Sequence, residues 1–278
     1  MIRKFKLINS LGGEYSLMNT DNGAFFTPAG LGYNDITEYQ QVGELFLPLT
    51  EKFGQQIITG SIVFGVKPYV KYLAFTKFCM HAPLIITYET DAGLYKIPVR
   101  MTKIEKGDTD GWTYMECPIE FTALARMYKT VTANNTGSIG GGKVYDYEYD
   151  YVYGDFAPDT VSIDSDSVTP SPCRITIFGP CSSPIWKHYV DGVQVATGRY
   201  FYNIPDQNKL VIDTTNSPYS IEEQDLLGNL IADRYELCEF NTERFFMLEY
   251  GKNTISVSHS DADNIRLMVE GYIFHETV

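Results

Sequence analysis

Apolar and polar residues alternate with a period of two along most of this chain. In residues 113–121 every second side chain is apolar: Met115, Cys117, Ile119 and Phe121. Residues 96–104 alternate in the same way, and the polar, glycine-containing segment 105–111 between them predicts a hairpin. Because successive side chains of a strand point to opposite faces, this pattern indicates half-buried strands. The chain is therefore predicted to be mainly β.

A single segment of the first half has helical rather than strand periodicity. Pro68 opens it, the apolar residues Val70, Leu73 or Ala74, and Phe78 follow at helical intervals, and Pro83 ends it. The other predicted elements of this half are strands at 3–8, 14–18, 56–64 and 84–89. We therefore expect a β-rich first half crossed by one helix.

Short apolar segments separated by turn-forming residues fill the second half. Strands are predicted at 173–178, 185–190, 193–196, 199–203, 209–213, 244–250, 253–258 and 264–274. Short strands at this spacing, with little helix, are typical of a β-sandwich of the jelly-roll type.

Charge divides the chain at a glycine-rich segment. Residues 1–143 carry 14 Lys and Arg against 13 Asp and Glu, whereas residues 144–278 carry 8 against 22. We therefore predict a domain over 1–136, a linker over 137–144 and a second domain over 145–278. The acidic second domain argues against nucleic-acid binding, which needs Lys and Arg at the phosphates. No apolar segment has the length of a signal peptide or a membrane span.

The linker fits the outline of a phosphate-binding loop, G-x-x-x-x-G-K, from Gly137 to Lys143. That loop needs Ser or Thr after the lysine and a helix behind it, but Val144 follows here. Tyrosines then alternate with acidic residues as on a strand, at Tyr145, Tyr147, Tyr149, Tyr151 and Tyr153. We interpret the segment as a linker that leads into an aromatic strand.

Metal and disulfide sites are not indicated. The acidic loops around Asp164 and Asp166, and around His259, Asp261 and Asp263, lack the further ligands of a calcium loop. Five cysteines with no C-x-x-C pair give no zinc site or disulfide framework; only Cys173 and Cys181 are close in sequence. Reduced thiols in a cytoplasm are the expectation.

Catalysis and cofactor binding are not indicated either. The four histidines, His81, His188, His259 and His275, lie in no nucleophile motif. The many carboxylates could supply a glycosidase pair, but no pair stands out. We therefore predict no catalytic, cofactor-binding or metal-binding residues.

One binding hypothesis concerns aromatic residues. Trp186 with Tyr147, Tyr149 and Tyr151 could form a saccharide-stacking surface, since β-sandwiches host lectins. The favoured alternative places Trp186 in the core and pairs the tyrosines across strands.

Several segments, in this order, carry a resemblance to a known family. They are "MIRKFKLINSLGGEYSLMN", "FFTPAGLGY", "QQIITGSIVFG" with the helix after it, "HAPLIITYETDAGLYKIPVRMTKIEKG", the tyrosine strand, "SPCRITIFGPCSSPIW" and "LEYGKNTISV". Together the chain resembles the distal tail proteins of long-tailed (siphovirus) bacteriophages, the hub of the baseplate. The likeness rests on the order of features and not on one diagnostic motif.

The resemblance implies a structural protein of the virion. An N-terminal β-sandwich with one helix and an extended hairpin would form a hexameric ring, and a galectin-like C-terminal sandwich would project outward. The ring would join the tail tube to the tail-tip protein and dock receptor-binding or other baseplate proteins, after assembly in the bacterial cytoplasm. No enzyme activity is implied. The alternatives are a carbohydrate-binding module for host cell-wall saccharide without a ring role, and a cell-wall glycoside hydrolase.

Overall fold

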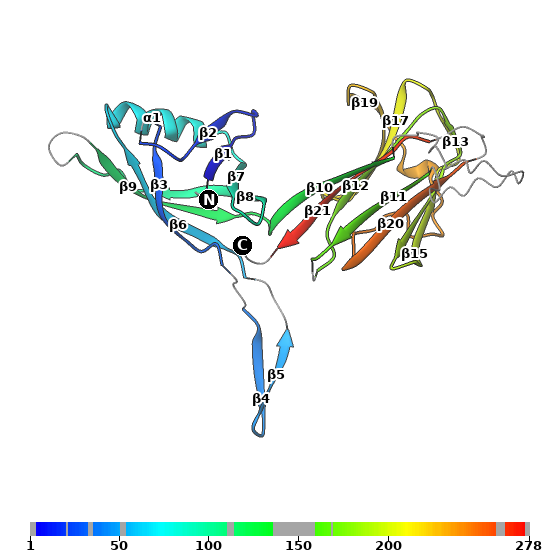
Figure 1. Cartoon of the computed structure of the whole chain (residues 1–278), viewed down its shortest axis with the longest axis horizontal. Coiled ribbons are helices and arrows are strands. Elements are labelled where there is room, and N and C mark those ends of the chain that lie inside the picture. Colours follow the sequence, from blue (N-terminus) through cyan, green and yellow to red (C-terminus); the bar gives the residue numbers. More distant parts are fainter. Residues whose placement is uncertain are drawn as a thin grey trace, which may run out of the picture. The chain divides into compact units, whose positions relative to one another are not determined.

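The computed structural model describes residues 4–20, 22–32, 36–50, 54–109, 114–135, 159–167, 169–259 and 265–275, which form two compact units (Figure 1). The N-terminal unit comprises Met1–Lys129 and His275–Val278, and the C-terminal unit comprises Thr130–Phe274. The chain enters the C-terminal unit within β10 (Met127–Asn135) and leaves it within β21 (Leu267–His275). The linker predicted at 137–144 lies outside the described residues, so the predicted domain limits stay a prediction.

Antiparallel strands form most of the N-terminal unit. They are β1 (Lys4–Ile8), β2 (Glu14–Ser16), β3 (Ala24–Ala29), β6 (Ile57–Phe64), β7 (Leu84–Glu89), β8 (Leu94–Ile104) and β9 (Met115–Ala123). Hydrogen bonding joins them in the order β3-β6-β9-β8-β7-β1-β2, with β10 also pairing with β8 through Tyr128 and Lys96. The predicted pairing of 96–104 with 113–121 is confirmed as β8 against β9.

The sheet of the N-terminal unit folds over one core. Alternate residues of β9 are buried, as the sequence pattern predicts, from Met115 to Ala123. Phe5 of β1 and Phe25 of β3 come from strands near opposite ends of the strand order, yet their ring centroids are 5.5 Å apart. The strand layer must therefore curve back on itself, which gives the sandwich-like packing expected from the sequence.

Helix α1 (Pro68–Cys79) covers part of this core (Figure 1). Pro68 occupies the first turn, where its missing N–H costs no helical hydrogen bond. The helix buries Phe75 and Cys79, and Phe75 packs against Phe64 of β6 with ring centroids 5.8 Å apart. The helix predicted from Pro68 onward is thus present.

Two facing sheets form the C-terminal unit. One follows the order β19-β18-β17-β12-β21-β10 and the other the order β11-β20-β14-β15. The strands not yet given are β11 (Thr160–Ser165), β12 (Cys173–Phe178), β14 (Ile185–Val190), β15 (Val193–Arg199), β17 (Asn208–Asp213), β18 (Ser220–Asp225), β19 (Leu230–Asp233) and β20 (Gly251–Ser258). A short pair, β13 (Cys181–Ser182) and β16 (Asn203–Ile204), and the 3₁₀ helix η1 (Tyr235–Leu237) complete the unit.

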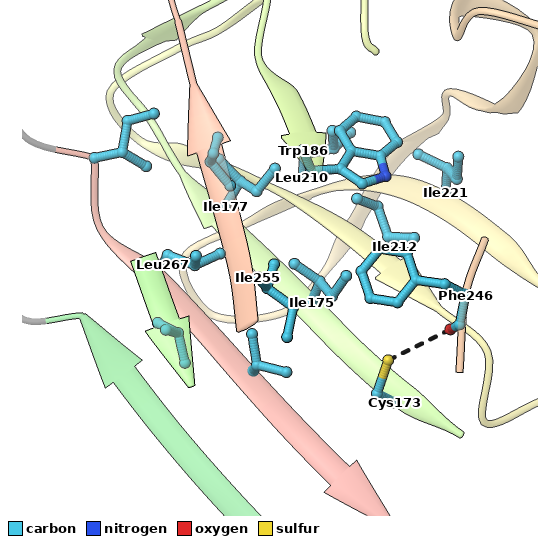
Figure 2. Packing of buried hydrophobic residues seen from close by; sticks show 14 of the residues in the cluster. Cys173, Ile175, Ile177, Trp186, Leu210, Ile212, Ile221, Phe246, Ile255 and Leu267 are labelled. Atoms are coloured by element: carbon cyan, nitrogen blue, oxygen red, sulfur yellow. Dashed lines mark hydrogen bonds between the residues drawn. The ribbon is translucent and has the colours of Figure 1, made fainter. Parts of the chain in front are cut away.

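The core of the C-terminal unit lies between these sheets (Figure 2). Ile175 and Ile177 of β12 and Leu210 and Ile212 of β17 face it from one sheet, and Trp186 of β14 and Ile255 of β20 face it from the other. Inward-facing residues of two sheets that alternate with outward polar ones are the hallmark of a sandwich. The predictions of a mainly β chain with β-sandwich packing are confirmed.

Two predicted strands of the second half are wrong. Residues 199–203 contain only the end of β15 and the start of β16, and residues 244–250 form no strand. In the latter, Phe246 and Leu248 are buried on alternate positions, but the segment's one β-bridge to the described residues is that between Leu248 and Ser171. The alternation therefore reflects real burial in a segment that lacks a strand partner.

Candidate functional site

A separate two-stranded hairpin presents a group of exposed apolar residues in the N-terminal unit. β4 (Glu38–Val42) and β5 (Leu45–Thr50) pair with each other and with no other described strand (Figure 1). Gly43, which with Glu44 links them, has a φ of 66°. This left-handed conformation suits glycine at the first central position of a two-residue hairpin turn.

Both faces of this hairpin are apolar and exposed. Leu45, Phe46 and Leu47 are consecutive, so they alternate between the faces, and they are 67%, 66% and 49% exposed. Tyr39, Val42 and Leu49 are more than half exposed as well. An isolated two-stranded ribbon is only marginally stable in water, and exposed apolar patches mark interaction sites. The hairpin therefore has the properties of a segment that packs against another chain.

The outer side of α1 carries a second apolar stripe. Val70 and Leu73, three residues apart, are 65% and 57% exposed, and Val66, in the turn before the helix, is 70% exposed. The helical spacing predicted for Val70 and Leu73 is therefore present, but these side chains face outward while Phe75 and Cys79 fill the core. Tyr69 lies beside the stripe, where its hydroxyl donates to Asp108 Oδ1 at 2.8 Å.

A pocket of about 450 Å³ lies between the chain segments that flank the hairpin and the β9–β10 turn. Its lining residues are Ile36, Gly54, Gln55, Gln56, Ala123, Leu124, Ala125 and Arg126. Gln56 Nε2 donates to Gly32 O at 3.0 Å, and Gln55 Nε2 donates to Ala123 O at 2.9 Å. Most polar groups here stabilise the loops, and no group of catalytic residues converges on the pocket.

Trp186 is a core residue. Its ring has no exposed surface, and its Nε1–H donates to Arg244 O at 3.0 Å. Because saccharide stacking needs an open ring face, the stacking role considered for Trp186 is wrong. The core position, favoured from the sequence, is what the structure shows (Figure 2). Tyr147, Tyr149 and Tyr151 lie outside the described residues, so a saccharide surface formed by them stays a prediction.

The histidines of the described residues are dispersed. His188 is buried with its ring stacked on Phe246 at 4.4 Å, and its Nε2 lies 2.9 Å from Asn253 Oδ1. Burial lowers the pKa of His188. His81 is exposed after α1, and His275 packs edge-on against Tyr95.

Metal ligands and thiols offer no reactive centre within the described part of the chain. It contains no cluster of three or more potential metal ligands; Asp164 and Asp166 are exposed, and Asp261 and Asp263 fall outside it. All five cysteines are buried free thiols, including Cys173 and Cys181. Burial raises the pKa of Cys79 and Cys173 to about 12, which keeps both in the unreactive thiol form.

The family resemblance implied an extended hairpin in the N-terminal domain, but the residue patterns did not locate β4–β5. The segment 38–50 contains an apolar run, LFLPL, next to a glycine turn, and this was the available signal. The run has no alternation because neither face of the ribbon is buried within its own chain.

Among the described helices, none is long and apolar enough to span a bilayer.

Comparison with known proteins finds one family model and several solved structures similar to this chain. Residues 4–124 match the family model "Distal tail protein, N-terminal domain". A chain of the phage P2 baseplate in its activated conformation with Ca is similar over 100% of both chains, with 12% identity and a TM-score of 0.68. The Dit (gp 19.1) protein of phage SPP1 is similar over 96% of this chain and 98% of its own, with 11% identity and a TM-score of 0.62.

Curated proteins give no match to this sequence. The structural likeness at 11–12% identity establishes the fold over the whole chain, and the family model establishes the relationship of residues 4–124. Residues 4–124 therefore match the N-terminal domain of distal tail proteins, and the whole chain shares the fold of these two phage proteins.

Proposed function

We propose that the N-terminal unit closes a hexameric ring at the end of the phage tail tube, with the hairpin β4–β5 packing onto the neighbouring copy. The exposed apolar surface of the hairpin carries this proposal. Burial of one Leu or Phe side chain contributes about 1.5–3 kcal/mol, so covering Leu45, Phe46 and Leu47 would supply a large share of a subunit contact. The number six follows the family resemblance.

The geometry of a ring requires two different contact surfaces on each copy. A head-to-tail contact, repeated by a rotation that closes, gives a ring, whereas a self-complementary contact stops at a dimer. The hairpin and the α1 stripe are two distinct apolar surfaces of one unit. Because the hairpin of one copy could contact a different surface on the next copy, these two surfaces support head-to-tail assembly.

Charge supports close packing of the same unit. Residues 1–143 carry 14 Lys and Arg against 13 Asp and Glu, so copies gathered around a channel accumulate little charge. The excess of acidic residues lies in the second half, which in this proposal projects from the ring. That unit would dock receptor-binding or other baseplate proteins, while the ring joins the tube protein to the tail-tip protein in the virion. The role requires no chemistry, so we expect no enzyme activity.

Mass measurement of the purified chain tests the ring. Six copies of 31.5 kDa give a particle of about 189 kDa by light scattering or native mass spectrometry. Because rings of this kind could need a neighbour to close, the measurement is repeated with the tube and tail-tip proteins of the same phage. A monomer or dimer under both conditions would contradict the proposal.

Substitution of the hairpin tests the surface. Leu45→Asp with Phe46→Asp places two charges where the apolar contact would be, and we expect the large particle to fall to single chains with no change in circular dichroism. Leu11→Asp is the control, since Leu11 is 74% exposed on the β1–β2 turn and is not part of the hairpin. Retention of the large particle by the hairpin variant would exclude β4–β5 as the contact.

A further inference from the structure

The C-terminal unit has an open sheet edge at β19. This strand is the last in its sheet and pairs with β18 alone among the described strands. It is coloured orange at the end of the sheet in Figure 1. Exposed edges can accept another strand, and proteins protect them with charged side chains, proline, bulges, short strands or a covering segment. β19, whose sequence is LIAD, is short, carries Asp233 and pairs with β18 across a register shift, but it contains no lysine or proline.

The backbone groups of Asp233 point outward from this edge. Arg234 N–H, one residue beyond β19, donates to Ile221 O of β18 at 2.8 Å. In an antiparallel ladder, successive residues direct their N–H and C=O groups alternately toward and away from the partner strand. Asp233, opposite Glu222, therefore directs its N–H and C=O away from β18, toward the open edge.

Apolar side chains surround the same edge. Leu227 in the β18–β19 turn is 90% exposed, and Leu230 and Ile231 of β19 are 62% and 49% exposed. Leu226 is 45% exposed beside them. Four apolar residues within one hairpin of a water-facing edge form a small apolar surface, here named the β19 edge surface (Leu226, Leu227, Leu230 and Ile231).

Hydrogen bonds and an ion pair hold this hairpin in place. In the turn, Asn229 N–H and Nδ2 donate to the two oxygens of Asp225 at 2.8 and 2.7 Å. Behind β19, Arg234 pairs with the buried Glu223 at 2.6 Å. Because β19 is already ordered without a partner, this chain would lose little conformational entropy when a partner strand binds.

The charge around the edge selects the partner. Residues 219–239 contain six acidic residues, Glu222, Glu223, Asp225, Asp233, Glu236 and Glu239, and a single basic one, Arg234, which is paired with Glu223. Lys209 of β17 lies near the turn, about 4.0 Å from the position of a Cβ on Gly228. The remaining carboxylates favour lysine and arginine on an approaching strand.

We propose that β19 binds an extended segment of another protein, in which apolar residues alternate with Lys or Arg, as an added strand of the sheet. Main-chain bonds to the outward groups of β19 would supply the pairing, and the β19 edge surface would receive the apolar residues. This rests on the proposed function, since the partner would be another baseplate protein docked on the C-terminal unit.

Synthetic peptides provide the test with the full-length chain. The probe is an eight-residue peptide that alternates Val and Lys, measured by fluorescence anisotropy, with hydrogen exchange of the protein read in parallel. We expect saturable binding and slower exchange of the amides of residues 230–233. A peptide alternating Val and Glu, and a Val–Lys peptide N-methylated on alternate residues, should each bind at least tenfold more weakly.

Variants of the chain locate the site. Leu230→Thr with Ile231→Thr removes apolar contact but keeps strand-favouring residues, and Asp233→Asn removes charge while an amide oxygen can still accept from Tyr235 N–H. Each should weaken binding at least fivefold without moving the unfolding midpoint. Val195→Thr is the matched control, because Val195 is 48% exposed on β15, the edge of the other sheet.

The outcomes separate the hypotheses. No binding, binding unchanged by the β19 variants, or slower exchange elsewhere would each overturn the proposal. A change of particle mass in the Leu230→Thr, Ile231→Thr variant would show that a second copy covers the edge, which overturns the partner proposed here. If the purified chain forms no hexamer but still binds the peptide at β19, the ring proposal is rejected and the β19 proposal is retained.

Discussion

Close contacts around Trp186 restrict which substitutions the neighbouring residues of the C-terminal core tolerate. A Cβ added at Gly198 of β15 would lie 2.4 Å from the ring of Trp186, far inside ordinary van der Waals distance. We expect Gly198→Ala to lower the free energy of unfolding by about 1–3 kcal/mol, because the ring is fully buried and cannot move aside. Chemical denaturation followed by tryptophan fluorescence measures this.

Gly32→Ala is the control for that substitution. A Cβ at Gly32 meets no atom within 4 Å, and the residue has no positive φ, so its unfolding free energy should change by less than about 0.5 kcal/mol. Equal stability of both variants would show that β15 can move away from Trp186.

His188 gives the C-terminal unit a dependence on pH. Burial lowers its pKa in the folded chain below the usual value near 6.5, while the hydrogen bond to Asn253 and nearby Glu249 act in the opposite direction. As pH falls below about 6.5 the unfolded chain takes up a proton more readily than the folded one, so stability decreases.

His188→Gln is expected to reduce this dependence, because glutamine does not titrate. Unfolding free energies measured between pH 7.5 and pH 5.5 should fall less steeply for the variant than for the parent chain. Parallel slopes for the two chains would contradict the assignment of the effect to His188.

The backbone conformation of Lys67 at the start of α1 predicts how a substitution there changes the stability of the helix. Lys67, which precedes the helix, has a φ of 58° and makes no side-chain cap. A non-glycine residue in this left-handed region costs about 1–3 kcal/mol, partly offset by the flexibility of glycine. We expect Lys67→Gly to raise the unfolding free energy of the N-terminal unit by about 0.5–1 kcal/mol.

Lys77→Gly supplies the comparison on the same helix. Lys77 lies in the last turn of α1, where glycine has a poor helix propensity, and the substitution should destabilise by about 1 kcal/mol. Thermal unfolding of both variants should move the same transition in opposite directions. Movement in the same direction would mean that the conformation at Lys67 carries no strain.

Elements whose apolar face is buried within the chain were predictable from sequence. β9 shows strict alternation because one side of it meets a core, and β12 alternates apolar residues with Arg174 and Thr176, although Thr176 is buried as well. β5 and β19 were missed for the opposite reason: their apolar residues lie outside both cores, so no period of two separates an inner from an outer face. α1 was found from its proline and its spacing, but the sequence could not say which of its two apolar stripes is buried.

The surfaces with functional interest were therefore the least predictable part. Their residues are selected by contacts that a single chain does not contain. The motifs considered for phosphate, metal and saccharide binding do not include these residues. Trp186 lies in the core, as the favoured alternative from the sequence had it, because its size suits the space between two sheets.

At the scale of the whole molecule, two cores predict two unfolding events. Phe121 belongs to the core of the N-terminal unit and Ile255 to that of the C-terminal unit. Calorimetry on the chain that carries Leu45→Asp and Phe46→Asp should show two unfolding transitions. Phe121→Ala should lower the midpoint temperature of one transition, and Ile255→Ala that of the other. Each truncation removes about 2–5 kcal/mol from its own core. A single transition lowered by both substitutions would reveal one cooperative unit.

The route of the chain through its two units has an evolutionary consequence. Residues 130–274 leave and rejoin the N-terminal unit through β10 and β21, which are neighbours in the sheet order. Such an insertion has closely spaced entry and exit points, so recombination could replace the whole inserted cassette without altering the residues that surround it. In the proposed role, a phage lineage would thereby change what docks on the C-terminal unit while it inherits the same scaffold.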